Sequence, residues 1–209
     1  MDEITLAMIR SVSFAKSNWV FMSMRLRRQF LKFTAASLLA PTAILVSGAN
    51  SSDDGPFKPL VKALLDIQKP VPIAVAKYLE AKQFDDYSYY LHLRSANLSI
   101  EDAAAIAGGI RALHSQPKAL LTSFSVSYNT GLQRKGLSSL LSTLPTKHLA
   151  ALGVVDCDLD DDSAYLIAEF ISKCQSLRMV CVEENNFSEQ AKDSIVKAGS
   201  KLAGCTTIV

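Results

Sequence analysis

The chain has 209 residues, of which 49% are hydrophobic and 20% are charged, so it can bury a core and is not expected to be disordered throughout. The net charge of +2 conceals an asymmetry, because residues 1–49 hold six of the 22 basic and two of the 20 acidic residues. Residues 50–209 therefore carry 16 bases and 18 acids, a net charge of −2, which argues against nucleic-acid binding.

Residues 24–49 follow the order basic, apolar, small that is typical of an export signal. Arg27 and Arg28 come just before an apolar run without charge, residues 33–46. Residues 47–49, Ser-Gly-Ala, then provide the small side chains that a signal peptidase requires. This order predicts that residues 24–49 are a signal peptide and do not belong to the fold.

The basic part of this segment resembles the twin-arginine (Tat) signal of bacteria, whose pattern is roughly Ser/Thr-Arg-Arg-x-Phe-Leu-Lys. Leu26 departs from that pattern at its first place, and the matching residues are Arg27, Arg28, Phe30, Leu31 and Lys32. The resemblance implies export as a folded protein to the periplasm or the extracellular space. The alternative is a membrane anchor, but the apolar run is shorter than the ~20 residues of a spanning helix, so we expect no stable membrane span after cleavage.

Two segments flank the predicted signal. Because signals of this type usually begin a few residues before the arginines, residues 1–23 are interpreted as a possible over-long N-terminus. Residues 50–56 are a polar leader. Helices are then expected over 57–67 and 73–82, separated by prolines that end one helix and start the next. We interpret residues 57–86 as a helical cap for the domain that follows.

A 28-residue periodicity marks residues 87–209. The stretches Leu149–Leu159 and Leu177–Phe187 both read L-x-x-L-x-L-x-x-(C/N)-x-L and align without a gap. Similar units begin near Leu91, where Ala96 replaces the Asn or Cys, and at Leu121, where one extra residue is needed. The same spacing predicts a last strand over 205–209, with Ile208 in the place of Val180.

Each place in this pattern has a physical role. The L-x-L core predicts a short strand whose alternate side chains point inward. The Asn or Cys is expected to turn inward and to bond backbone groups that would otherwise lack partners. Ser99, Asp160 and Ser188 stand where an N-cap would open the following helix.

These units resemble the leucine-rich repeat family, in its ribonuclease-inhibitor-like subtype. The resemblance implies an α/β fold: a short solenoid with a curved parallel sheet, outer helices and an N-terminal helical cap. The alternative is an ordinary α/β domain in which the spacing arose by chance. No cofactor, metal or catalytic motif is recognised in residues 50–209.

Cysteine, histidine and aspartate side chains can act as nucleophiles or metal ligands, so their positions in the pattern are informative. Cys157 is predicted to be buried and structural, whereas Cys181 should face the open side of the sheet. The three histidines share no metal-ligand spacing. The acidic run Asp156–Asp162 lacks the glycine turn of a calcium loop, so we expect it to cap a helix.

The strand register predicts which side chains line the open face of the sheet. Its middle should be small and nearly uncharged, and its ends should carry the large groups. The candidate partner-binding residues are Tyr90, His92, Arg94, Tyr128, Met179, Glu183 and Glu184. We hypothesise an exported interaction module with a protein partner. The alternatives are an enzyme or cofactor-carrying accessory protein of the envelope, and a regulator of GTPases as the repeat subtype implies.

Overall fold

The computed structural model describes residues 57–81, 88–114 and 119–209. The possible over-long N-terminus, the polar leader and the predicted signal motif lie outside the described residues. That motif is Arg27, Arg28, Phe30, Leu31 and Lys32.

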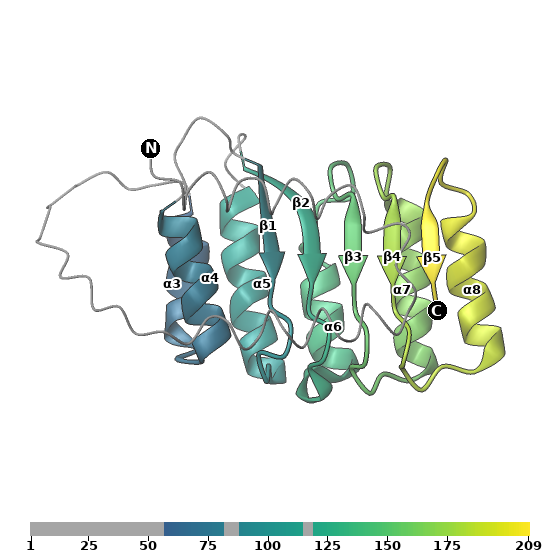
Figure 1. Ribbon diagram of the computed structural model, residues 1–209, viewed down its shortest axis with the longest axis horizontal. Coiled ribbons are helices and arrows are strands. Elements are labelled where there is room, and N and C mark those ends of the chain that lie inside the picture. The colour runs from purple at the N-terminus through teal and green to yellow at the C-terminus, as the bar shows by residue number, and fades with distance from the viewer. Residues whose placement is uncertain (1–56, 82–87, 115–118) are drawn as a thin grey trace, which may run out of the picture. The chain divides into compact units, whose positions relative to one another are not determined.

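Strands and helices alternate along the chain from Ser88 onward (Figure 1). In order they are β1 (Ser88–His92), α5 (Ile100–His114), β2 (Leu120–Ser125), the short 3₁₀-helix η1 (Thr130–Leu132), α6 (Gln133–Leu141), β3 (Ala151–Gly153), α7 (Asp161–Lys173), β4 (Met179–Cys181), α8 (Glu189–Gly199) and β5 (Thr206–Ile208). The five strands form one sheet in the order β1-β2-β3-β4-β5, and every pair is parallel. The predicted α/β class with a parallel sheet is therefore confirmed.

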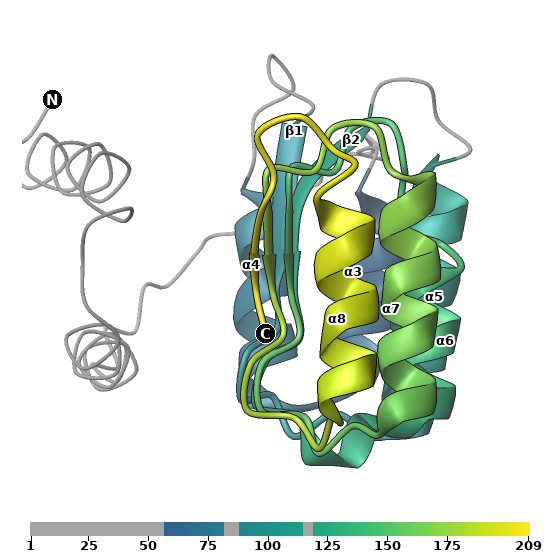
Figure 2. The same ribbon diagram turned by 90° about the vertical axis from the view of Figure 1, so that its right-hand side faces the viewer.

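The helices α5 to α8 cover one face of this sheet (Figure 2). Among the described residues, no helix covers the opposite face. We call that opposite face the open face. Because side chains alternate along a strand, half of the strand residues point into the helical layer and half point to the open face.

Two further helices, α3 (Lys58–Asp66) and α4 (Pro70–Glu80), lie at the β1 end of the sheet. They fall close to the expected ranges, but α4 begins before residue 73. The reason is that both of its prolines, Pro70 and Pro72, sit in the first turn, where a missing N–H costs nothing. Of the two, α3 packs directly against α5.

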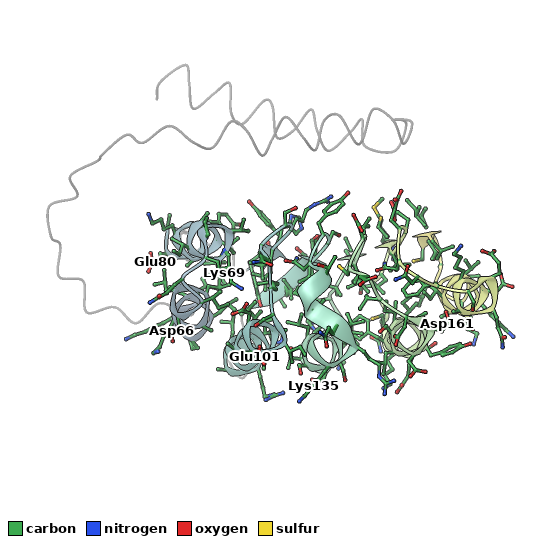
Figure 3. The ribbon with its side chains drawn as sticks, turned by 90° about the horizontal axis from the view of Figure 1, so that it is seen from below. Asp66, Lys69, Glu80, Glu101, Lys135 and Asp161 are labelled. Atoms are coloured by element: carbon green, nitrogen blue, oxygen red, sulfur yellow. The ribbon has the colours of Figure 1, made fainter. Side chains whose placement is uncertain are left out.

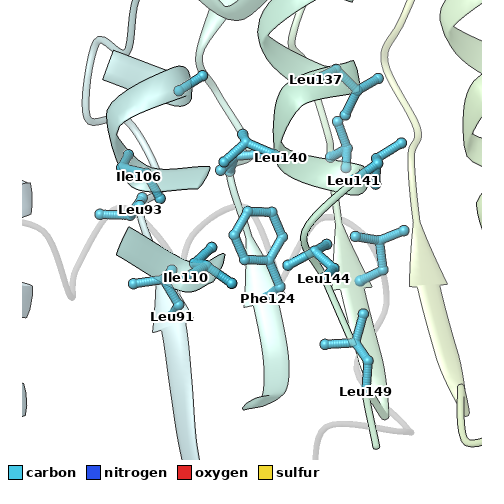
Figure 4. Close-up of a cluster of buried hydrophobic side chains, with 14 of the residues drawn as sticks. Leu91, Leu93, Ile106, Ile110, Phe124, Leu137, Leu140, Leu141, Leu144 and Leu149 are labelled. Atoms are coloured by element: carbon cyan, nitrogen blue, oxygen red, sulfur yellow. The ribbon is translucent and has the colours of Figure 1, made fainter. Parts of the chain in front are cut away.

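The predicted inward strand residues form the core. Leu91, Phe124, Leu152 and Val180, one from each of the first four strands, are buried. Figure 4 shows Leu91 and Phe124 beside Ile110 of α5. Leu140 of α6 and Leu144, which follows α6, lie nearby. This apolar packing between the sheet and its helices is the main stabilising contribution to the fold.

The strand register follows the 28-residue spacing in the middle of the sheet. Ser123 pairs with Ala151 and Ala151 with Met179, and Leu152 pairs with Val180 as predicted. The placing of Ile208 opposite Val180 was wrong, because Thr207 pairs there. Helix α8 has 11 residues where α7 has 13, and the connection after it is one residue longer. The net effect is a shift of one residue.

The asparagine ladder predicted from the pattern is present. The Nδ2 group of Asn129 donates to the carbonyl oxygens of Leu93 (2.8 Å) and Val126 (2.7 Å). Its Oδ1 accepts from the N–H of Leu98 at 3.0 Å. Asn185 bonds its own turn and the preceding one in the same way. Each asparagine thus joins two successive turns through backbone groups.

A row of residues with positive φ runs across the ends of the first four strands. They are Ser95, Tyr128, Asp156 and Glu184, with φ of 52°, 64°, 51° and 64°. We call them the left-handed row. The N–H groups of the first three donate to the carbonyls of Ser127 (3.0 Å), Val155 (2.7 Å) and Glu183 (3.1 Å). These bonds extend the pairing of neighbouring chains beyond the strand ends.

The three predicted N-caps are confirmed. The side chain of Asp160 accepts from the N–H of Ser163, and that of Ser188 from the N–H of Ala191. The Ser99 hydroxyl accepts from the N–H of Asp102 at 3.2 Å, and the Asp102 carboxylate accepts from the N–H of Ser99 at 2.8 Å. The latter pair is a reciprocal capping arrangement.

Candidate functional site

Four of the seven candidate partner-binding residues lie on the β1 side of the open face, and they are Tyr90, His92, Arg94 and Tyr128. In β1 the burial alternates, so Tyr89 and Leu91 are buried while Tyr90 and His92 are exposed. Tyr90 keeps 46% of its surface exposed, and the other exposed aromatic side chain among the described residues is Tyr165 of α7, at 42%. Exposed aromatic groups of this kind are common anchors in protein interfaces.

Three rings form a continuous stack on this side. The ring of Tyr90 lies against Tyr78 of α4, with centroids 4.7 Å apart and an interplanar angle of 25°. The ring of His92 lies 5.1 Å from that of Tyr90 and is tilted by 40°. The two contacts restrict the Tyr90 side chain, which lowers the conformational entropy that binding would cost.

His92 also contacts the neighbouring strand. Its Nε2 lies 2.8 Å from the Ser123 hydroxyl oxygen on β2. Burial and the nearby charge of Arg94 both lower the pKa of His92, so the ring is neutral at pH 7. A neutral ring offers one donor and one acceptor, which suits a hydrogen bond to a hydroxyl.

Arg94 and Tyr128 form a second contact. The Arg94 guanidinium carbon lies 5.2 Å from the centre of the Tyr128 ring, within the range of a cation–π interaction. We call Tyr78, Tyr90, His92, Arg94 and Tyr128 the aromatic–arginine cluster. The structure therefore brings together four of the seven candidate residues.

The side chains in the middle of the open face are small and uncharged, as expected. Ser125 and Ser127 are buried, and their hydroxyl oxygens lie 3.2 Å apart. A side chain at Gly153 would put its Cβ 2.9 Å from the Ser125 hydroxyl oxygen. Val155 completes this small surface and is also buried. Nothing here projects toward a partner.

The remaining three candidates lie on the β4 side and not with the cluster. Met179 and Glu183 are partly buried, and Glu184 is exposed. Within the described residues, Oε2 of Glu183 is shielded from solvent and has no hydrogen-bond partner. A carboxylate oxygen that is shielded from water and lacks a donor costs free energy.

Sequence reasoning missed two features of this face. Tyr78 was assigned only to the cap helix, although it supplies one ring of the stack. Asp156 was assigned to helix capping, but it is exposed and belongs to the left-handed row beside Glu183. The place of Asp156 could have been predicted if the residue with positive φ after each strand had been treated as part of the repeat. No pattern in the sequence predicts the contact between Tyr78 and Tyr90.

Two of the four cysteines, Cys157 and Cys174, are buried. Burial raises the pKa of Cys157 to about 11 and, with the neighbouring Cys205, that of Cys174 to about 12. Both thiols are therefore protonated at neutral pH and poor nucleophiles. The Cys157 thiol lies 3.3 Å from the Val126 carbonyl oxygen, so its predicted structural role is confirmed.

The acidic run Asp156–Asp162 forms contacts between turns. Besides the cap at Asp160, Asp161 accepts from the Ser188 hydroxyl at 2.7 Å, and Figure 3 shows Asp161 beside the last helices. Asp162 pairs with Arg134 of α6. In the described part of the chain, no three His, Cys, Asp or Glu side chains gather as a metal site would require. None of the described helices is long and apolar enough to cross a membrane.

No protein family and no curated protein matches the sequence.

Proposed function

We propose that this protein is an exported leucine-rich repeat protein of the ribonuclease-inhibitor-like subtype that binds a protein partner through its open face. Two observations support the repeat assignment. Strands β2, β3 and β4 pair at offsets of 28 residues, and Asn129, Cys157 and Asn185 occupy the same bonding position at that offset. Stacked repeats of this kind commonly present a broad binding surface.

The observation that carries the proposed binding role is the aromatic–arginine cluster on a sheet face without a helical cover. Tyrosine and arginine side chains contribute most of the binding energy in many interfaces, especially where neighbours hold them in place. Tyr90 contacts the rings of Tyr78 and His92, and Arg94 lies over Tyr128. These contacts prepare large side chains for contact with another molecule.

The test compares two sets of substitutions in the full chain. One variant changes Tyr90, Arg94 and Tyr128 to alanine. The control changes Lys173 and Lys192 on the helical side, each of which pairs with a glutamate of its own helix. Each protein is used to capture partners from cell-envelope extract, and the captured proteins are identified and quantified by mass spectrometry.

We expect a defined set of proteins to bind the wild type and the control and to be depleted, about tenfold or more, with the face variant. Urea unfolding of all three proteins checks that folding is retained. Loss of binding by the helical-side control instead would contradict the proposed function, and so would equal capture by wild type and face variant.

A further inference from the structure

The open face has a cationic and an anionic end, and we propose that it selects a partner segment of opposite polarity. The segment carries a carboxylate over Arg94 on the β1 side and a lysine or arginine over Glu183 and Asp156 on the β4 side. This inference rests on the proposed function, because it names the chemistry of the partner that the same face would bind.

The cationic end is Arg94. It follows β1, lies over Tyr128 and is close enough to lower the pKa of His92. Within the described residues its guanidinium forms no ion pair with a carboxylate. A guanidinium that contacts a ring through a cation–π interaction can still donate N–H groups to a carboxylate.

The anionic end consists of Glu183, which follows β4, and Asp156 of the left-handed row. They are adjacent, because the N–H of Asp156 donates to the carbonyl oxygen of Glu183 at 3.1 Å. Asp156 is exposed, and Oε2 of Glu183 lacks a donor within the described part of the protein. A basic side chain that approaches the exposed Asp156 would offset the negative charge of both carboxylates.

The surface between the two ends is suited to let a backbone pass. Ser127 follows β2 and Val155 follows β3, so both lie between Arg94, which follows β1, and Glu183, which follows β4. Both are buried. A partner segment that crosses the strands would meet no large side chain there. Since like charges facing one another are costly, a segment with the reverse polarity would be rejected.

The spacing defines the partner further. Arg94 and Glu183 follow strands that are three steps apart in the sheet order, which places them roughly 14 Å apart at ~4.8 Å per step. In a helix this distance corresponds to about nine residues at 1.5 Å each. In an extended segment it corresponds to about four residues.

The experiment selects binders from a phage-displayed library of random dodecapeptides against the full chain. Selected peptides are then synthesised and titrated against Tyr90→Ala, Arg94→Glu, Glu183→Gln and Glu183→Lys. The matched control is Glu169→Lys on α7, whose carboxylate pairs with Lys173 on the helical side. Glu183→Gln keeps the shape of the side chain, so it remains informative if Glu183→Lys does not fold.

The proposal predicts that selected peptides carry an acidic and a basic residue at the expected separation. Arg94→Glu and Glu183→Gln should each weaken binding about tenfold, and exchanging the two peptide charges should restore binding to the Arg94→Glu, Glu183→Lys double variant. Peptides that require Tyr90 but lack this polarity would overturn the inference and leave the proposed function standing. Peptides affected only by Glu169→Lys would overturn both.

Discussion

The ammonium nitrogen of Lys69 lies 2.5 Å from Oδ2 of Asp102 and 2.5 Å from the carbonyl oxygen of Asn97. Lys69, labelled in Figure 3, precedes α4 as its N-cap residue, and Asp102 belongs to the first turn of α5. The contact therefore joins the helical pair at the β1 end to the first strand–helix connection. Burial alone raises the pKa of Asp102, but the bonds from Lys69 and Ser99 and the Lys69 charge outweigh it and lower the pKa.

We expect Lys69→Met to lower the free energy of unfolding by about 1–3 kcal/mol at pH 7, because it leaves the partly buried Asp102 carboxylate without its cation. The control is Lys62→Met, which removes an exposed ion pair with Asp66 and should have little effect. Urea denaturation measures both. Equal effects of the two substitutions would show that the contact does not hold the helical pair.

The same contact predicts a dependence on pH. The folded pKa of Asp102 lies below its unfolded value of about 3.9, so its contribution to stability is present above that pH and is lost as the pH falls through the folded pKa. The difference between wild type and Lys69→Met should therefore be constant near neutrality and shrink below about pH 4. A difference that stays unchanged in acid would assign the effect to packing.

Asn129→Ala is expected to destabilise the protein by roughly 2–4 kcal/mol, because it leaves several buried backbone groups without partners. Asn185→Ala should cost less, roughly 1–3 kcal/mol, since Asn185 is only partly buried. Asn129→Cys should be tolerated better than Asn129→Ala, because Cys157 occupies the equivalent position and bonds a carbonyl there. The reverse order in denaturation experiments would contradict the role of the ladder.

The core was largely predictable because its signal is local. The alternation around Leu152 and Val180 and the polar residues Asn129 and Ser188 have single, strong structural preferences. The same reasoning placed His92 and Arg94 on the open face.

Other features depend on contacts that no local pattern encodes. Tyr78 meets Tyr90 only because α4 lies beside β1. The one-residue shift of β5 follows from the shorter α8 and the longer connection after it. Tyr128 and Glu184 adopt a conformation that their residue types do not favour.

Leu152→Ala should cost about 2–5 kcal/mol, from lost burial and the cavity left between the sheet and its helices. Leu152 is 1% exposed, whereas Leu120 at the start of β2 is 38% exposed. Leu120→Ala is the matched control and should change stability by less than about 0.5 kcal/mol. Similar unfolding midpoints for the two variants would contradict the assignment of inward and outward strand places.

The export prediction concerns the segment before the described fold. If residues 24–49 are a twin-arginine signal, the mature protein begins near Asn50, and replacing Arg27 and Arg28 by lysine retains the precursor in the cytoplasm. N-terminal sequencing of the exported protein and fractionation of cells measure this. A wild-type product that keeps residues 24–49 and stays in the membrane would instead indicate an anchor.

The left-handed row affects which substitutions are suitable for testing the side chains of the open face. For an L-residue the αL conformation costs roughly 1–2 kcal/mol, and alanine bears that cost as tyrosine or glutamate does. Glycine does not, although it gains entropy in the unfolded chain. At Tyr128, Asp156 and Glu184, truncation to glycine therefore removes a side chain while relaxing the backbone beneath it. Comparing glycine with alanine at these positions separates what a side chain does for binding from what its backbone conformation costs in stability.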